Sequence, residues 1–323
     1  MYWPIGGLHF PICAPTAGDH CARDTMAVSP GAGRPWAAPN LLPLPMPVHT
    51  RNSSELALSL EDVALGYGDF TVLDGISMQV RAGQVVAVMG GSGSGKTTLL
   101  RAATGQIVAQ RGSVQAFGTD VGSVSQDGLQ SLRKRMGVLF QQGALFTDLN
   151  VFENVAFPLR EHTSLDEAEL TARVLDKLDA VGLRTAAHLR VAEISGGMAR
   201  RVALARAVVL EPELILYDEP FAGLDPISMG ITARLIRSLA DRLGCATVLI
   251  THDVQESFAI ADQVYLVGQG RLAAAGTPQQ LAASQDPYVK QFLNGEPDGP
   301  VAFQYPETPA FRAWLAQQEG RKP

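Results

Sequence analysis

The chain has 323 residues, which is enough for one large domain or two ordinary ones. Hydrophobic residues make up 46% and charged residues 18%, and the net charge of −6 without a long basic run disfavours nucleic acid as the main partner. No apolar run approaches the ~18 residues that a membrane-crossing helix needs, so a membrane process would require another chain to span the bilayer. The three cysteines (Cys13, Cys21 and Cys245) fit no metal-binding spacing, which indicates a reducing compartment.

Residues 1–54 differ from the rest of the chain. The first fifty residues hold nine of the twenty prolines and only four charged residues, and they show no periodicity. This composition predicts a disordered, proline-rich leader. It is not typical of a signal peptide, because no basic segment precedes an apolar core. We hypothesise that native translation starts at Met26 or Met46, which an intact mass that includes Met1 would exclude.

Strands are predicted at intervals from residue 55 onward. Leu56–Leu60 alternates in polarity, as do the stretches around Val72 and Met78, so antiparallel strands are expected there. Continuous apolar runs are typical of buried parallel strands. Such runs lie at 84–89, 136–140, 214–217 and 246–250. A hairpin is predicted from 263–267 and 271–272, turning at 268–270.

Helices are predicted between these strands at 98–103, 165–183 and 202–210, where apolar residues recur at helical spacing. The alternation of strands and helices implies an α/β core built on a parallel sheet. Residues 142–200 are mostly helical and are expected to form a separate lobe. The main domain is expected over 55–293, and a short helix near Phe311, Trp314 and Leu315 is expected in the tail.

A glycine loop joins the first parallel strand to the helix that follows it. Its sequence is GGSGSGKTT, which has the spacing G-x-x-x-x-G-K-[ST] of a phosphate-binding loop. Glycines let backbone N–H groups surround an anion, and the helix N-terminus adds partial positive charge. The predicted nucleotide-binding residues are Gly90, Gly91, Ser92, Gly93, Ser94, Gly95, Lys96, Thr97 and Thr98. Lys96 is expected to reach the β- and γ-phosphates, and the Thr97 hydroxyl to bind Mg²⁺.

Polar residues follow three of the apolar strands at the point where each strand ends. Asp218 is expected to hold Mg²⁺, and Glu219 to act as the general base on the attacking water. His252 is expected to contact the γ-phosphate, and Gln141 to reach the metal and the attacking water. Tyr67 either stacks on adenine or packs in the core.

A second glycine segment, Ser195, Gly196 and Gly197, precedes the helical residues 202–210. Serine is a favoured N-cap, so an ordinary helix cap is one interpretation. The other is a second anion-binding helix N-terminus. Because one chain needs only one γ-phosphate site, a second one suggests that it serves a partner's nucleotide.

Together these motifs resemble those of the ATP-binding cassette (ABC) ATPases. Counted from Lys96, Gln141, Ser195, Asp218 and His252 lie 45, 99, 122 and 156 residues further on, in the order of the family's Q-loop, signature, Walker B and H-loop motifs. Asp225 belongs to a segment similar to the D-loop. The resemblance covers about residues 56–285. It implies a P-loop NTPase (RecA-like) core with an antiparallel β subdomain, an inserted helical subdomain, and ATP hydrolysis with Mg²⁺.

The resemblance also implies a head-to-tail homodimer. Each ATP would lie between Lys96 of one copy and Ser195 and Gly197 of the other, so ATP joins the copies and hydrolysis releases them. The helical region would carry this closure to a membrane subunit through residues after Gln141. Where the family usually has Leu-Ser-Gly-Gly-Gln, this chain ends the motif with Met198, which lacks the glutamine amide.

Residues 195–201 and 218–230 are similar to those of the ATPase subunits of maintenance-of-lipid-asymmetry (Mla) phospholipid transporters. This resemblance implies a permease in the membrane, an MCE-domain lipid-binding subunit, a STAS-domain protein and phospholipid as cargo between inner and outer membranes. It places the chain peripherally on the cytoplasmic face of the inner membrane. The tail, residues 294–323, would contact the neighbouring copy, with Tyr305 in that contact.

Three other readings remain. An ATPase of a polar-solute importer is disfavoured by Met198 and by the tail. A soluble ABC protein of DNA repair or translation needs a long coiled-coil insertion or a second cassette, and neither is present. An inactive regulatory cassette is disfavoured by the intact Lys96, Glu219 and His252.

Overall fold

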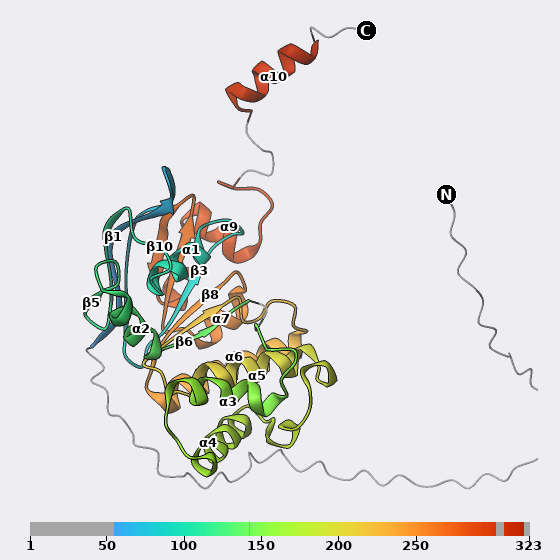
Figure 1. Cartoon of the computed structure of the whole chain (residues 1–323). Helices are drawn as coiled ribbons and strands as arrows, with labels where there is room; N and C mark the ends of the chain where they lie inside the picture. Colours follow the sequence, from blue (N-terminus) through green and yellow to red (C-terminus); the bar gives the residue numbers. More distant parts are fainter. Residues whose placement is uncertain (1–54, 142, 302–306, 320–323) are drawn as a thin grey trace, which may run out of the picture. The chain divides into compact units, whose positions relative to one another are not determined.

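The computed structural model describes residues 55–141, 143–301 and 307–319, and the structural statements below concern these residues. Two sheets form the main body (Figure 1). The smaller is antiparallel, in the order β2-β1-β4-β5. Its strands are β1 (Leu56–Tyr67), β2 (Phe70–Arg81), β4 (Arg111–Ala116) and β5 (Thr119–Asp120).

The larger sheet has six strands in the order β10-β9-β3-β8-β7-β6. Five strands are parallel, and β10 pairs antiparallel with β9. They are β3 (Val85–Met89), β6 (Met136–Leu139), β7 (Leu214–Asp218), β8 (Ala246–Thr251), β9 (Gln263–Gly268) and β10 (Arg271–Gly276). Every residue of β3, β7 and β8 is buried. Helices or the other sheet cover both faces of these strands, which explains their continuous apolar sequences.

Helices pack on both faces of the larger sheet. Their bounds are α1 (Lys96–Ala103), α2 (Gln126–Lys134), α3 (Val151–His162), α4 (Glu167–Ala180), α5 (Gly196–Val208), α6 (Pro226–Leu243), α7 (Val254–Ile260), α8 (Pro278–Ala282) and α9 (Pro287–Asn294). Short 3₁₀ turns lie at Arg184–Ala186 and Val191–Glu193. Helix α10 (Pro309–Glu319) follows residue 306 and is described by itself.

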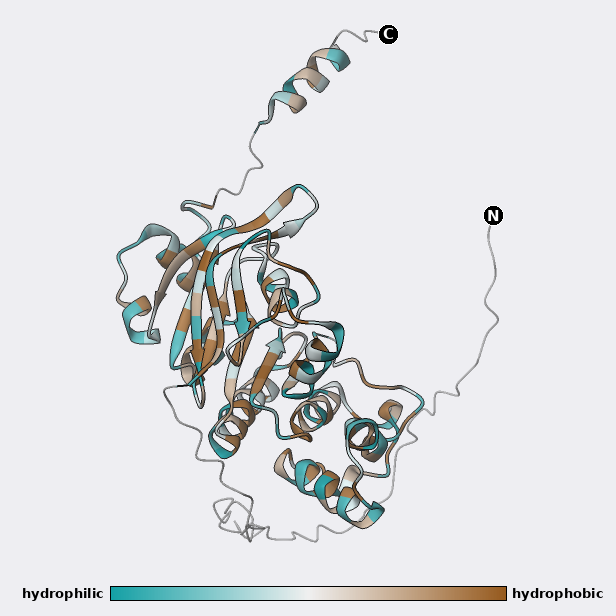
Figure 2. Ribbon diagram, turned by 60° about the vertical axis from the view of Figure 1, so that its left-hand side comes forward, coloured by the Kyte–Doolittle hydropathy of each residue, from teal (hydrophilic) through white to brown (hydrophobic). Residues whose placement is uncertain are grey.

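The core divides into two clusters, one on each face of the larger sheet. Alternate residues of β3 show this, since Val85, Ala87 and Met89 join one cluster and Val86 and Val88 the other. The first cluster includes α3–α6, and the second includes α1, α2 and the antiparallel sheet. Figure 2 shows the brown, apolar segments of the central strands between these layers. Side chains of α3 and α4 belong to the first cluster, so the helical region shares the core of the sheet.

The predicted α/β class is confirmed, as are the strands expected from the apolar runs. The helix expected at 202–210 begins earlier, at Gly196, because Ser195 caps it. The tail helix near Phe311 and Trp314 is present, with the two rings stacked 5.8 Å apart. The leader (1–54) and Tyr305 lie outside the described residues. Within the described part of the chain, no helix has both the length and the apolar character needed to cross a bilayer.

Candidate nucleotide-hydrolysis site

The glycine loop lies between β3 and α1, at the carboxyl end of a central strand. Gly93 and Gly95 have φ angles of 77° and 99°, which L-residues rarely adopt. A Cβ at Gly90 would lie 2.4 Å from the carbonyl oxygen of Val267, and one at Gly95 would lie 2.7 Å from Leu73. Backbone conformation and crowding therefore both require glycine here. The loop leads directly into the N-terminus of α1. Backbone N–H groups at a helix N-terminus favour the binding of an anion.

Lys96 is the first residue of α1 and its side chain is 7% exposed. The ammonium donates hydrogen bonds to the carbonyl oxygens of Gly90 (2.8 Å) and Gly91 (3.0 Å). It also lies 3.9 Å from Oε1 of Glu219. Burial lowers the pKa of Lys96, while the carboxylates of Glu219 and Asp218 act in the opposite direction. A cation is thus held at the loop in a partly desolvated position, where its field is weakly screened.

Asp218 ends β7 and is 7% exposed. Its Oδ1 is buried and has no hydrogen-bond partner among the described residues. Burial raises the pKa of Asp218, Glu219 adds to the rise, and Lys96 and Arg101 oppose it. An unpartnered buried carboxylate oxygen needs a partner to offset its desolvation. The three residues predicted to bind Mg²⁺, Asp218, Thr97 and Gln141, all offer oxygen atoms, the donor type that Mg²⁺ prefers.

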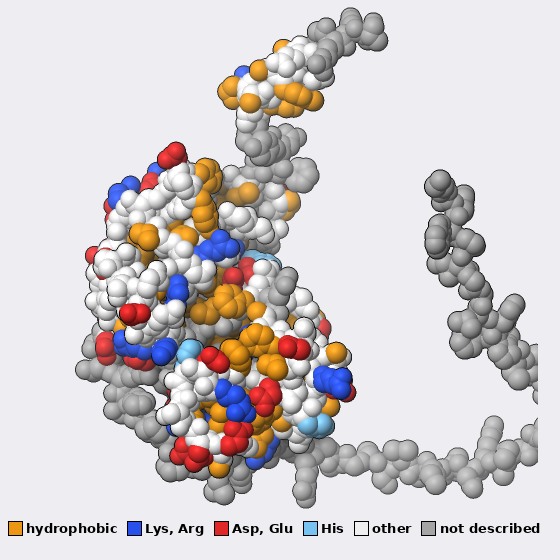
Figure 3. All heavy atoms as spheres, viewed as in Figure 1, with side chains coloured by type: hydrophobic (Ala, Val, Ile, Leu, Met, Phe, Trp, Pro, Cys, Tyr) orange, Lys and Arg blue, Asp and Glu red, His pale blue; other side chains and the backbone are white. Residues whose placement is uncertain are grey.

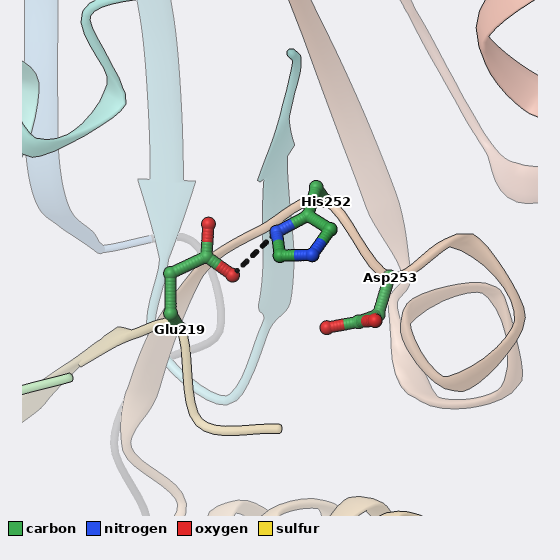
Figure 4. Close-up of side chains that lie close together, drawn as sticks. All are labelled: Glu219, His252 and Asp253. Carbon is green, nitrogen blue, oxygen red and sulfur yellow. Dashed lines mark ion pairs between the residues drawn. The ribbon is translucent and has the colours of Figure 1, made fainter. Parts of the chain in front are cut away.

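Glu219, His252 and Asp253 converge beside this position (Figure 4). Oε2 of Glu219 lies 3.0 Å from Nδ1 of His252, and one ligand atom from each of the three residues lies within 4.8 Å of the others. Glu219 has a φ of 48°, a strained value for a residue with a Cβ, and its N–H donates to the carbonyl oxygen of Ile250 (2.8 Å). The Thr251 hydroxyl donates to Asp253 (3.0 Å). Asp253 was not predicted as a site residue, although it directly follows His252.

A cavity of about 300 Å³ joins several of these segments. It is lined by Val72, Ser92, Gly93, Ser94, Gly95, Lys96, Thr97, Thr98, Gln141 and Glu219. The structure therefore brings the glycine loop, the end of β6 and the end of β7 to one place. Parallel strands place their carboxyl ends at the same edge of a sheet, which is where ligands bind in such folds.

Tyr67 lies at the end of β1 and is 44% exposed, so it is not a core residue. Its hydroxyl accepts a hydrogen bond from Arg101 of α1 (2.9 Å). A hydrogen bond with Thr98 lowers the pKa of Tyr67, and Arg101 adds to this effect. The ring is thus tied to the helix that follows the glycine loop. Arg101 was not predicted, because only the folded chain brings it to Tyr67.

Ser195, Gly196 and Gly197 lie apart from the Lys96 cavity. Ser195 caps α5, and its Oγ accepts a hydrogen bond from the N–H of Met198 (3.2 Å). Gly196 lines a different cavity of about 330 Å³, together with parts of 143–147 and 222–224.

Asp225 caps α6 in a similar way. It accepts hydrogen bonds from the N–H groups of Ile227 and Ser228 and from the Ser228 hydroxyl, which lower its pKa. Asp225 is also absent from the lining of the Lys96 cavity. One chain therefore carries two separate groups of predicted nucleotide-binding residues.

The chain is similar in sequence to known transporter ATP-binding proteins. The profile of the ABC transporter family matches residues 73–222. The chain is 49% identical over 249 residues to the intermembrane phospholipid transport system ATP-binding protein MlaF of Haemophilus influenzae, covering 77% of this chain and 94% of that protein. Against MlaF of Escherichia coli K12 the identity is 50%, covering 77% and 93%. A probable ribonucleotide transport ATP-binding protein of Mycobacterium leprae is 37% identical, covering 76% and 71%.

Solved structures of ATP-binding cassettes have a similar fold. The cbiO1 protein of Clostridium perfringens, part of the ABC transporter complex cbiONQ, aligns with a TM-score of 0.67 at 29% identity, covering 74% of this chain and 95% of that one. A dimeric ATP-binding cassette in a post-hydrolysis state, bound to ADP and phosphate, aligns with a TM-score of 0.63 at 27% identity, covering 68% and 98%.

Proposed function

The chain belongs to the ABC transporter ATPases, and on that premise we propose that it drives a transporter that moves phospholipid between the inner and outer membranes. The evidence for phospholipid as the cargo is the 49–50% identity to intermembrane phospholipid transport ATP-binding proteins, which extends along 93–94% of their length. ATP hydrolysis is supported by four residues that lie at one edge of the sheet: Lys96, Asp218, Glu219 and His252.

The proposed reaction is attack of water on the γ-phosphorus of ATP. The glycine-loop N–H groups and Lys96 hold the β- and γ-phosphates. Glu219 removes the proton from the water, the new O–P bond forms, and the bond to the β-phosphate oxygen breaks with its electron pair leaving on ADP. His252, 3.0 Å from Glu219, orients that carboxylate and the γ-phosphate. Thr97, Gln141 and Asp218 would hold Mg²⁺, which neutralises phosphate charge when bound.

The second group of residues leads to a head-to-tail homodimer. Ser195, Gly196, Gly197 and Asp225 do not line the cavity that contains Lys96, so in this proposal they bind the nucleotide of a second copy. The dimeric cassette among the structural relatives supports this arrangement. Tyr67, exposed beside α1, would stack on the adenine ring.

A groove suited to a membrane subunit lies close to Gln141. This cavity of about 490 Å³ is lined by three partly exposed phenylalanines, Phe140, Phe146 and Phe157, together with Pro158 and Arg206 among others. Figure 3 shows hydrophobic side chains gathered across the middle of one face. Exposed apolar patches of this kind mark sites of protein contact. We propose that a permease helix docks here, which would hold the chain on the cytoplasmic face of the inner membrane.

Further partners rest on the resemblance to the Mla ATPase subunits alone. We propose an MCE-domain lipid-binding subunit attached to the permease and a STAS-domain protein bound to the ATPase. The tail, residues 294–323, would clasp the neighbouring ATPase copy. Transport of a polar solute is the second candidate, since a relative at 37% identity is named a probable ribonucleotide transport protein. Its lower identity and coverage make it the weaker one.

Copurification tests the cargo. The tagged chain is recovered from mildly solubilised native membranes, and its proteins and lipids are identified by mass spectrometry. We expect a permease, an MCE-domain subunit and phospholipid. A solute-binding protein with the permease would replace the phospholipid cargo by a polar solute. Recovery with no membrane protein would contradict the transporter assignment.

Two variants refine this experiment. Phe157→Glu replaces one of the three phenylalanines of this groove by a charged residue and should release the permease. The matched control is Phe70→Glu, because Phe70 is 71% exposed and does not line the groove. Equal recovery of the permease with both variants would contradict docking in this groove.

A further inference from the structure

Arg200 joins two loops that flank the nucleotide site. We propose that this residue is a positioning residue that couples the two ATP sites of the dimer, an inference that rests on the proposed head-to-tail dimer. Its Nη1 donates a hydrogen bond to the carbonyl oxygen of Phe140 (3.2 Å), and its Nη2 donates to that of Ala222 (3.1 Å). One planar guanidinium therefore bridges two segments that lie 82 residues apart in the sequence.

The environment of Arg200 shows that this bridge is costly. The residue is 7% exposed, and burial lowers the pKa of its guanidinium. Among the described residues, no carboxylate forms an ion pair with it, so the two carbonyl groups compensate the buried charge. A buried charge with neutral partners is poor for stability. An apolar residue would avoid that penalty but could not bridge the two carbonyl groups, which points to a role for the bridge itself.

Each bridged carbonyl lies next to a segment of the site. Phe140 directly precedes Gln141, which lines the Lys96 cavity. Ala222 donates its N–H to the carbonyl oxygen of Glu219 (3.2 Å) and begins the segment 222–225 that ends at Asp225. Arg200 thereby connects the segment that leads to Gln141 with the turn that follows Glu219.

A second arginine of α5 holds the other side of the same segment. Arg206 donates to the carbonyl oxygens of Gly143 (2.7 Å) and Ala144 (2.8 Å). Helix α5 thus forms hydrogen bonds with the backbone on both sides of Gln141. A displacement of α5 along or about its axis would act on the backbone on both sides of Gln141 through these hydrogen bonds.

The same helix begins with the residues proposed to bind the partner's ATP. Ser195 caps α5, and Arg200 follows five residues later, about 7.5 Å along the axis. ATP in the partner's site would restrict the motion of the first turn of α5. Through Arg200 it would also restrict the motion of Gln141 in this chain's own site. Two sites that bias one element in this way are energetically coupled, and the coupling is reciprocal.

The test is ATP hydrolysis by the purified transporter complex, measured against ATP concentration. We expect the wild-type complex to show a Hill coefficient above 1, with the two sites setting the upper limit of about 2. Arg200→Gln should bring the coefficient to about 1, because residues of this kind change the coupling between sites roughly 2- to 30-fold, and it should also lower kcat. Arg200→Lys should also lose cooperativity, because an ammonium reaches one carbonyl but cannot bridge both.

Arg201→Gln is the matched control. Arg201 is the neighbouring, half-buried arginine of α5, and its Nη1 donates to the carbonyl oxygen of Val181 (3.0 Å) rather than to a loop of the site. It should keep the wild-type Hill coefficient. Unchanged cooperativity in Arg200→Gln, a non-cooperative wild type, or equal loss in Arg201→Gln would each overturn the proposal. If Arg200→Gln does not fold, Arg200→Lys decides in the same way.

A binding measurement separates this inference from the proposed function. Equilibrium titration with a fluorescent ATP analogue reports cooperativity without turnover. A wild-type complex that binds the analogue but hydrolyses no ATP would contradict the proposed function. The Hill coefficient of binding would still decide on Arg200, since the coupling acts on nucleotide binding itself.

Discussion

Replacing Glu219 by glutamine removes the proposed general base and leaves the shape of the site intact. Glutamine has nearly the volume of glutamate, so the backbone at φ 48° and the packing of this largely buried side chain are retained. Only the carboxylate is lost, and with it the proton acceptor 3.0 Å from His252. The variant should therefore bind ATP and fail to hydrolyse it.

The expected loss follows from the chemistry of the base. General-base catalysis contributes about 10²- to 10⁴-fold in rate. At about 1.36 kcal/mol for each factor of ten, this corresponds to a rise in the activation barrier of roughly 2.7–5.4 kcal/mol. ATP affinity should stay equal or rise, because the variant removes a negative charge 3.9 Å from Lys96, beside the expected phosphates. Slow hydrolysis with retained binding should accumulate an ATP-bound dimer.

Phosphate release and light scattering measure these two effects. Glu219→Gln should show the rate loss and a shift from monomer to dimer on addition of ATP. Glu61→Gln, an isosteric change at an exposed position of β1, serves as the control and should behave as wild type. Hydrolysis at the wild-type rate in Glu219→Gln would refute the assignment of the base.

Further changes test the remaining parts of the site. Lys96→Ala should weaken ATP binding at least about tenfold by calorimetry, since a charge-assisted phosphate contact exceeds about 1.4 kcal/mol. Ser195→Ala should cost about 1 kcal/mol of stability in chemical unfolding through loss of the α5 cap, and should abolish the ATP-dependent dimer. Asp218 binds its proton more tightly in the folded chain, because burial raises its pKa above the ordinary 3.8. Its contribution to stability therefore falls as pH rises from 3.8 through that raised value, so Asp218→Asn should unfold at a higher temperature than wild type at neutral pH while losing hydrolysis.

Local chemistry explains what could be predicted from the sequence. The phosphate-binding loop from Gly90 to Thr98 could be predicted because its backbone conformation and anion binding both require particular residue types. The strands β3, β7 and β8 are apolar throughout because both faces of the sheet are covered. Asp218, Glu219 and His252 could be grouped because they follow neighbouring parallel strands. In each case the determining interaction lies within a few residues or follows from a general rule of sheets.

Other features depend on contacts distant in sequence and were missed. The buried face of helix α6 includes the small or polar residues Thr232 and Ala233 beside larger apolar ones. Its helical periodicity is therefore hard to recognise in the sequence. The hairpin of β4 and β5 pairs with β1, and nothing local to residues 111–120 signals that partner. Arg200 looks like a solvated arginine in the sequence, because its two acceptor carbonyls lie 60 and 22 residues away. The contact expected for Tyr305 and the disorder of the leader stay predictions.

Several features of the site are unfavourable for the chain by itself. Glu219 holds a left-handed backbone, Lys96 and Asp218 have lost hydration, and Oδ1 of Asp218 lacks a partner among the described residues. Strain and desolvation of this kind persist where the surrounding fold enforces them, and they collect at functional sites. Phosphate oxygens beside Lys96 and a cation beside Asp218 would relieve both desolvation costs at once. Nucleotide should therefore stabilise the fold by about 2.7 kcal/mol at a hundred times its Kd. Because Ser195 and Asp225 lie outside the same cavity, part of that stabilisation should appear only at protein concentrations that permit the dimer.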